Sequence, residues 1–346
     1  MKKHIRTVQL IAAAGLAIIF NPLSASSESV YVSNYTNPGS IIKLTLDGVA
    51  SAFASGLLFP ESFPEGLAID GAGNVFVTTG ASQILKFTPD GRHSTYGSAD
   101  SIESLAFDNT GNLFGTSPNF ATVFRLPPGD FPPTFADYRT ARLSFPTSLA
   151  FDGVGNVYVA NHGGMFDPNH NLYAGTIEKF SPMGTDLGAF ATGLSGPFGL
   201  AFDSLGNLFV SNTESSTIEK ITPNGGRSVF ANAGLNNPKG LAFDSAGNLY
   251  VANAGSNTVA KFTPAGVGSV FATGLDNPTF IAIGPDVPEP STWGMLYLGL
   301  PALLARGNPR MRGKGSRGKG KGKERKGSGA EERKGSEKNG IKLRAV

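Results

Sequence analysis

The chain has 346 residues, 40% of them hydrophobic and 16% charged, with 46 glycines and no cysteine. Without cysteine, disulfide frameworks, thiolate metal sites and cysteine nucleophiles are excluded. The formal net charge of +3 averages two opposite segments, since residues 306–346 carry 15 Lys and Arg against 4 Asp and Glu, and residues 7–305 carry 11 against 22. An acidic folded part would repel phosphate backbones, so we expect it to bind no nucleic acid.

The N-terminal segment, residues 1–26, has the pattern of a secretory signal peptide. Lys2, Lys3 and Arg6 precede an apolar run from Val8 to Phe20, and small residues follow. A positively charged start, a short apolar run and small residues are the three parts of such a signal. The run is also short for a membrane-spanning helix. The sequence therefore predicts export of a chain that begins near residue 27.

Residues 27–286 repeat one pattern, whose fullest copy is GLAFDSAGNLYVANAGSNTVAKFTP. The copies begin at Gly66, Ser104, Ser148, Gly199, Gly240 and, truncated, Phe280. Successive copies are 38 to 51 residues apart, which is the spacing of four-stranded β-propeller blades. Each copy contains four short runs rich in β-branched and aromatic residues, separated by turn residues. We therefore expect four strands and no helix per copy.

The two ends of the repeat region complement each other. Residues 29–58 offer three strands but lack the inner one, and residues 280–284 supply an inner strand alone. If both ends join in one blade, the ring closes without a free edge. The sequence thus predicts an all-β fold, a six-bladed β-propeller of four-stranded blades in which the N- and C-terminal strands share one blade.

This pattern resembles the NHL-repeat family of β-propellers and, more loosely, the gluconolactonase and streptogramin-lyase propellers. The resemblance covers residues 29–285. It implies the fold but leaves the function open, because one propeller scaffold hosts enzymes, binding proteins and scaffolding proteins.

Residues 287–312 resemble the PEP-CTERM sorting signal of Gram-negative bacteria. The matching parts are Pro288, Glu289 and Pro290, an apolar run over residues 293–305, and the basic residue Arg306. The resemblance implies transient insertion in the inner membrane, with the arginine side cytoplasmic, and processing by an exosortase-type membrane protease. It also implies delivery to the cell surface or the extracellular matrix of a Gram-negative bacterium.

Residues 313–346 consist almost entirely of Gly, Lys, Arg, Glu and Ser. Such a composition cannot bury a core, so we expect a disordered basic tail. The tail could be an arm for anionic lipid or nucleic acid, or an overhang that is removed with the sorting segment.

Two kinds of polar position recur in the repeat. An aspartate ends each inner strand, and the following Gly-Asn predicts a turn in which the carboxylate accepts backbone N–H bonds. These aspartates are Asp70, Asp108, Asp152, Asp203 and Asp244. We interpret them as structural, because repetition in every blade spreads them around the ring.

At the opposite face, the residue before each inner strand varies from copy to copy, as expected of a site. This column reads Glu65, Glu103, Thr147, Phe198, Lys239 and Thr279. The residues that end the second strands read Asn34, Thr79, Ser117, Asn161, Asn212 and Asn253. Loops at this mouth are held rigidly by the ring and are therefore the expected place for function.

The acidic residues of the first column suggest a metal site. Glu65 and Glu103 lie on adjacent blades and could share a cation, with Asn161, Asn212 or Asn253 as neutral oxygen ligands suited to Ca²⁺ or Mg²⁺. This set resembles the acidic-plus-asparagine metal site of gluconolactonase-like propellers. The alternative is that each asparagine caps its own loop and the glutamates are solvated.

The fourth copy carries an insertion, NHGGMFDPNHNLYAGT, after its second strand. It contains His162, Asp167 and His170, and a long loop in a compact ring is often functional. His162 over the mouth would suit a general base in a lyase or hydrolase. Catalysis of the streptogramin-lyase kind would require the loop to fold inward, toward Glu65 or Glu103.

The sequence contains no nucleophile elbow, zinc-protease helix, phosphate loop or nucleotide fingerprint. We therefore expect a non-catalytic binding or matrix-interaction module whose partner is an extracellular protein, a polysaccharide or a small ligand. The alternative is a divalent-metal-dependent lactonase, hydrolase or lyase with its site at the mouth.

Overall fold

The computed structural model describes residues 28–36, 39–55, 64–80, 82–89, 92–130, 132–139, 141–163 and 175–285. The predicted signal peptide, sorting motif and basic tail lie outside these residues, as do Asp167 and His170. Among the described residues, no helix is long and apolar enough to cross a membrane.

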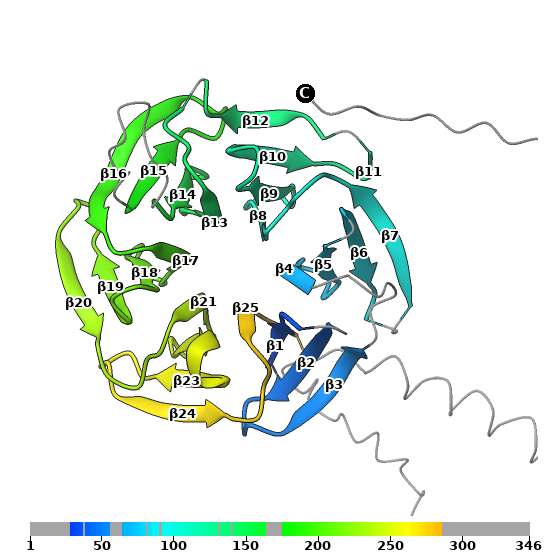
Figure 1. Ribbon diagram of the computed structural model, residues 1–346, viewed down its shortest axis with the longest axis vertical. Helices are drawn as coiled ribbons and strands as arrows, with labels where there is room; N and C mark the ends of the chain where they lie inside the picture. The colour runs from blue at the N-terminus through cyan, green and yellow to red at the C-terminus, as the bar shows by residue number, and fades with distance from the viewer. Residues whose placement is uncertain are drawn as a thin grey trace, which may run out of the picture. The chain divides into compact units, whose positions relative to one another are not determined.

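The described residues form six antiparallel sheets arranged around a common axis (Figure 1). Because the strands are short and bounded by turn residues, each copy folds back on itself as a meander. The inner strands are β25 (Pro278–Pro285), β4 (Pro64–Ile69), β8 (Ser104–Phe107), β13 (Pro146–Phe151), β17 (Pro197–Phe202) and β21 (Pro238–Phe243). The fold is thus the predicted six-bladed β-propeller.

The other strands follow outward in each blade. The first blade continues with β1 (Glu28–Asn34), β2 (Ser40–Thr45) and β3 (Ala50–Ser55), and the second with β5 (Val75–Thr79), β6 (Gln83–Phe87) and β7 (His93–Ser98). The third continues with β9 (Leu113–Ser117), β10 (Thr122–Leu126) and β12 (Thr134–Asp137), and the fourth with β14 (Val157–Asn161), β15 (Gly175–Phe180) and β16 (Asp186–Leu194).

The fifth blade continues with β18 (Leu208–Asn212), β19 (Thr217–Ile221) and β20 (Arg227–Ala231). The sixth continues with β22 (Leu249–Asn253), β23 (Thr258–Phe262) and β24 (Gly268–Ala272), and a single 3-10 turn, η1 (Ala254–Ser256), follows β22.

One blade departs from the predicted four strands. A two-residue strand, β11 (Gly129–Asp130), leaves the third blade and pairs in parallel with β7 as a fifth strand of the second blade. Gly97 permits this approach, since a Cβ there would collide with the carbonyl oxygen of Gly129. The irregular third copy therefore covers its neighbour's outer edge.

Strand β25 closes the ring by pairing antiparallel with β1, as predicted. Tyr31 lies opposite Ala282 across this pair. Its side chain is fully buried and packs edge-on against Phe53 of the same blade. The blade in which the first and last described strands pair therefore has a buried aromatic contact of its own.

Aromatic side chains connect the second, third, fourth and fifth blades each to the blade that follows. Phe76 on β5 packs edge-on against Tyr96 in its own blade and against Phe107 in the following blade, with both ring centroids 5.0 Å away. The same arrangement recurs around Phe114, Tyr158 and Phe209. Because buried aromatic rings contribute large apolar areas, these trios account for much of the inter-blade core.

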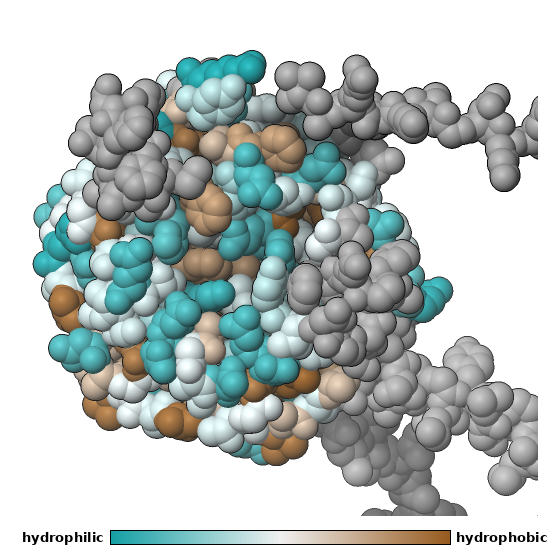
Figure 2. Space-filling model, in the orientation of Figure 1, coloured by the Kyte–Doolittle hydropathy of each residue, from teal (hydrophilic) through white to brown (hydrophobic). Residues whose placement is uncertain are grey.

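The propeller has two distinct faces, called here the mouth face, where the inner strands begin, and the turn face, where the Asp-x-x-Gly-Asn turns lie. Inner and second strands are antiparallel, so Pro146 lies opposite Asn161 at the mouth face and Phe151 opposite Val157 near the turn face. In the view of Figure 2, hydrophobic residues are scattered among hydrophilic ones outside the grey atoms.

Candidate functional site

The mouth face contains a cavity of about 380 Å³ beside the axis. It is lined by Tyr35, Glu65, Ser101, Glu103, Pro118, Asn119, Phe145, Lys239, Thr279 and Phe280. Four of these residues, Glu65, Glu103, Lys239 and Thr279, belong to the variable column identified in the sequence. The structure therefore brings both predicted glutamates to one cavity.

The lining depends on the loops that lead into the inner strands. In this loop, the residue two positions before the column residue has a left-handed backbone in four described copies: φ is +58° at Ser101, +53° at Phe145, +48° at Asn237 and +47° at Asn277. Gly196 has the same conformation at φ +61° in the fifth blade. Asparagine and glycine tolerate this region, but phenylalanine is strained there. Strain at Phe145 therefore occurs where its ring lines the cavity.

Three ionisable side chains face the cavity. Burial raises the pKa of Glu65 to about 7, and burial and then the charge of Glu65 raise the pKa of Glu103 to about 8; Lys239 opposes both shifts. Burial lowers the pKa of Lys239, against the opposing effect of the two glutamates. At neutral pH, Glu103 is therefore mostly protonated and Glu65 is close to half-ionised.

These three groups have no hydrogen bond and no close ion pair with any described residue, although all are partly buried. Polar groups that are removed from bulk water require partners from water or a ligand. Burial also raises the pKa of Tyr35, and the charges of Glu65 and Glu103 add to this effect. The side chains of Glu65, Glu103 and Lys239 therefore require partners from water or a ligand.

One of the cavity-lining residues, Phe280, belongs to an aromatic pair. The rings of Phe198 and Phe280 lie 5.4 Å apart between centroids, and the ammonium of Lys239 lies 5.3 Å from the Phe198 centroid. This cation–π contact positions the lysine without a carboxylate partner. Thr147, from the same column, is fully buried, and its hydroxyl is within hydrogen-bond distance of the carbonyls of Ala160, Pro197 and Phe198.

Two of the predicted asparagine ligands serve the loops of their own blades. The amide of Asn161 accepts a hydrogen bond from the Ser144 N–H and donates one to the Arg142 carbonyl. Asn253 does the same with the Asn236 N–H and the Gly234 carbonyl. Both side chains are almost fully buried, and neither lines the cavity. Their contacts match the loop-capping alternative.

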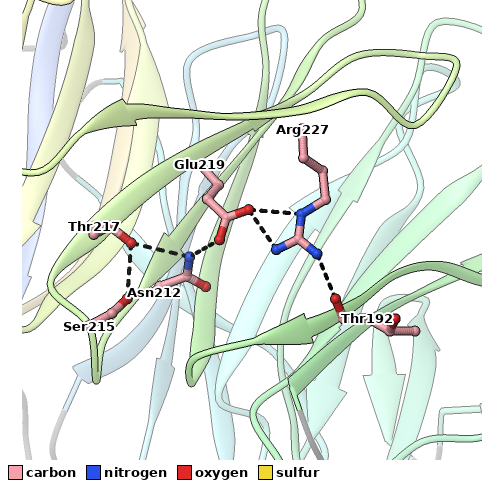
Figure 3. A network of polar contacts seen from close by, with 6 residues as sticks. All are labelled: Thr192, Asn212, Ser215, Thr217, Glu219 and Arg227. Carbon is pink, nitrogen blue, oxygen red and sulfur yellow. Dashed lines mark hydrogen bonds and ion pairs between the residues drawn. The ribbon is translucent and has the colours of Figure 1, made fainter.

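Asn212 belongs to a different network (Figure 3). Its amide nitrogen donates to Glu219 and Thr217, and Glu219 binds Arg227 through two N–H bonds of 2.9 and 2.7 Å. Arg227 also donates to the Thr192 carbonyl of the neighbouring blade. The Asn212 Oδ1 atom is buried without a described partner. Asn212 therefore links the fifth blade to the fourth, outside the cavity lining.

The imidazole ring of His162 lies edge-on to the Phe145 ring, with the two centroids 6.2 Å apart. Its Nε2 atom is 3.4 Å from the Thr213 hydroxyl, and it does not line the mouth cavity. No group of three or more His, Cys, Asp or Glu side chains suited to a metal ion occurs within the described part of the chain. Pro288, Glu289, Pro290 and Arg306, which were predicted to form a sorting signal, lie outside that part.

The five turn aspartates act as the sequence analysis predicts. In each turn, one carboxylate oxygen accepts the backbone N–H of the asparagine four residues later and the other accepts its side-chain amide. For Asp203 the two distances are 2.8 and 2.7 Å. These carboxylates are therefore part of the scaffold.

Three aromatic residues of the cavity, Tyr35, Phe145 and Phe280, were not identified from the sequence. A signal for Phe280 existed, since it occupies the position held by glycine or serine at the start of the other copies. Phe145 precedes Pro146, but Phe63 precedes Pro64 in the same way in another copy, so the pattern does not single Phe145 out. A comparison of equivalent positions therefore indicates Phe280 but not Phe145.

No curated protein sequence matches the chain significantly. Among solved structures, the complex of nidogen and laminin contains a chain with a TM-score of 0.63 and 22% identity, and the match covers 74% of this chain and 98% of that one. A structure of virginiamycin B lyase from Staphylococcus aureus matches with a TM-score of 0.51 and 16% identity, and the match covers 75% of this chain and 92% of that one. A structure described as a gluconolactonase matches with a TM-score of 0.51 and 19% identity, and the match covers 63% of this chain and 79% of that one.

At these identities the structural matches establish the fold alone. The NHL repeat pattern matches residues 235–262, which span the end of the loop into β21 through β23. The chain is therefore a six-bladed β-propeller that is closed by its first and last described strands and that matches an NHL repeat over residues 235–262.

Proposed function

We propose that the protein is a non-catalytic binding module whose mouth cavity holds a neutral, hydroxyl-rich ligand of the carbohydrate class. The observation that carries the proposal is the set of three partly buried ionisable groups, Glu65, Glu103 and Lys239, without hydrogen-bond partners around one cavity. A ligand would supply the missing partners.

The charge state of the cavity supports a neutral ligand. Near neutral pH the two carboxyls together hold more than one proton, and the lysine offsets the remaining negative charge. Protonated Glu103 and Lys239 can donate hydrogen bonds, and Glu65 can accept them. Sugar hydroxyls both donate and accept, and the flat C–H face of a sugar ring suits the rings of Phe145 and Tyr35.

The strained backbone at Phe145 also supports a binding role. A left-handed phenylalanine costs folding free energy of about 1–3 kcal/mol. Asparagine adopts the same left-handed conformation at the equivalent loop position of the sixth and first blades, at Asn237 and Asn277. Retaining a ring at this position is therefore better explained by contact with a ligand than by the fold.

Binding can be tested with the full chain on a glycan array, followed by calorimetry with any sugar that binds. We expect Lys239→Met to abolish binding. Lys220→Met is the matched control, because Lys220 also lies over a phenylalanine ring, at 5.5 Å, but outside the cavity. Binding that is absent from the wild type, or unchanged in Lys239→Met, would contradict the proposal.

A second candidate is a divalent-metal-dependent lactonase, hydrolase or lyase at the same cavity. It is favoured by one observation, that two carboxyl groups, Glu65 and Glu103, line one cavity; burial and then the charge of Glu65 raise the pKa of Glu103, and a bound cation would relieve both effects. We would measure the thermal midpoint with Ca²⁺, Mg²⁺ and Zn²⁺ for the wild type and for Glu65→Ala/Glu103→Ala. A metal-induced rise lost in the double variant, with lactone or lyase turnover, would favour this candidate over the first.

We also propose that the protein is exported and delivered to the cell surface or extracellular matrix of a Gram-negative bacterium. This rests on the resemblances of residues 1–26 and 287–312. Mass spectrometry of the exported protein from strains with and without an exosortase tests it. Cleavage near Pro288 that requires the exosortase supports the proposal, and an intact C-terminus in both strains contradicts it.

A further inference from the structure

A lysine covers an aromatic ring of the second strand in four blades. The ammonium lies 4.9 to 5.5 Å from the ring centroid in the pairs Lys86–Phe76, Lys179–Tyr158, Lys220–Phe209 and Lys261–Tyr250. In each pair the two residues lie opposite each other on the second and third strands. The lysine thus closes the turn-face end of the blade over the aromatic trio.

The third blade breaks this rule. Arg125 lies opposite Phe114, in the lysine position. Its Nη2 atom instead donates a hydrogen bond of 2.6 Å to the Asn112 Oδ1 atom. Within the described part of the chain, no lysine or arginine lies over the Phe114 ring. Arg125 therefore does not cover the Phe114 ring as the lysines cover the equivalent rings in the four other blades.

A cavity of about 520 Å³ opens at this place, between the third and fourth blades. Its apolar walls come from Phe114, Phe135, Phe151, Pro182 and Met183. Phe114 packs edge-on against the other two rings, with centroids 5.2 and 5.1 Å away. The cavity lies on the turn face, away from the mouth cavity, and shares no residue with it.

The polar groups of this cavity differ in how many hydrogen bonds they make within the protein. The Asp108 carboxylate accepts four hydrogen bonds within its turn, from the backbone N–H and the side chain of both Thr110 and Asn112. Its charge is therefore compensated locally. Arg125 is exposed, and its guanidinium makes only the bond to Asn112 among the described side chains.

We propose that this cavity is a second binding site, specific for a small carboxylate with an aromatic or aliphatic body. Arg125 supplies a forked set of N–H donors that matches the two oxygens of a carboxylate. The three phenylalanines accept the apolar body. A neutral apolar ligand would make no hydrogen bond to Arg125. A polyanion would find only one positive charge in the cavity and would be repelled by the Asp108 carboxylate.

The site can be tested on the full chain by NMR with ¹³C-methyl methionine. The chain has five methionines, and Met183 lines the cavity with 89% of its surface exposed, so its methyl group reports binding directly once assigned with Met183→Leu. Benzoate and hexanoate are the probes, and benzyl alcohol is the neutral counterpart of benzoate.

We expect a saturable shift of the Met183 signal with both carboxylates and a dissociation constant about tenfold higher or more for benzyl alcohol, as the loss of a charged hydrogen bond implies. Arg125→Gln should weaken benzoate binding similarly. Arg125→Lys, which can restore the lysine arrangement of the other blades, should weaken it too. Lys220→Gln, at the matching position of the fifth blade, should leave it unchanged.

The proposal is overturned if Met183 shows no saturable shift, if benzoate and benzyl alcohol bind equally, or if Arg125→Gln binds benzoate as the wild type does. The thermal midpoint of each variant establishes that it is folded. Should Arg125→Gln not fold, the decision rests on Arg125→Lys, which keeps the charge and the strand propensity. None of these results depends on the mouth cavity.

Discussion

Phe198 on β17 and Phe280 on β25 are in ring contact, with centroids 5.4 Å apart, although the sixth blade stands between their blades. In Figure 1 both strands border the centre of the ring. Phe280 lines the mouth cavity and also a second cavity of about 260 Å³ among the inner strands. The pair therefore separates the mouth from the rest of the axis.

This contact predicts a coupled loss of stability. Phe280→Ala removes a nearly buried ring and should lower the free energy of unfolding by about 3–5 kcal/mol. Phe198→Ala should act similarly, and the two effects should couple by about 0.5–1.5 kcal/mol, as expected for an aromatic pair. Urea unfolding of both single variants and the double variant measures the coupling. Strict additivity would show that the two rings act independently.

Replacing the strained phenylalanine at the mouth should separate stability from binding. Phe145→Asn gives the loop the residue that Asn237 and Asn277 provide at the same φ in other blades. The free energy of unfolding should rise by about 1 kcal/mol, while ligand binding at the mouth weakens. Asn237→Gly, a conservative change in the matching loop, is the control. A destabilised Phe145→Asn would mean that the ring contributes more by packing than its backbone costs.

The raised pKa values of Glu65 and Glu103 predict stability that falls with rising pH. In the unfolded chain both carboxyls ionise near pH 4.5, whereas in the folded chain they retain protons up to about pH 7 and 8. Their contribution is therefore fully present below about pH 4.5 and is lost as the pH rises through 8.

Glu103→Gln tests this linkage because it fixes the neutral state. Relative to the wild type, the variant should gain about 1–3 kcal/mol at pH 9 and little at pH 4. Thermal unfolding at several pH values provides the measurement, and Glu219→Gln, outside the cavity, is the comparison. A gain that does not depend on pH would contradict the assigned shift.

The turn aspartates should differ in importance according to their burial. Asp244 is 7% exposed, accepts bonds from Asn248 and the Tyr250 hydroxyl, and lies 3.8 Å from the Lys261 ammonium. Asp244→Ala should cost about 2–4 kcal/mol, because buried donors lose a charged acceptor. Asp108→Ala, in the more exposed turn, should cost less. Chemical unfolding of both variants would reveal equal losses if burial had no effect.

Ring closure by β25 should be essential for cooperative folding. Deleting residues 278–285 removes the inner strand of the first blade and exposes the edge of β1, including the fully buried Tyr31. We expect the loss of a single sharp thermal transition, because the remaining blades form an open array with two free edges. A deletion variant that still unfolds sharply near the wild-type midpoint would show that five blades suffice.

The sequence alone determined the blades, because the strands and the aspartate turns between them depend on residues that lie close together in each copy. Asp203, Gly206 and Asn207 form their turn within one copy, so any copy predicts it. The complementary ends at Ser29 and Phe280 even predicted closure, since a strand that is missing at one end and surplus at the other has only one place to pair.

Only the tertiary structure decided which variable residues meet. The repeat predicted that Glu65 and Glu103 meet at the mouth, but spacing along the chain does not show that Lys239 joins them in one cavity. Nor does it show that Asn161 and Asn253 bond to their own loops instead. The diversion of Arg125 from Phe114 is likewise invisible in the sequence, where arginine replaces lysine in an ordinary strand. Both outcomes depend on side-chain directions set by packing between blades, which a pattern repeated along one chain does not contain.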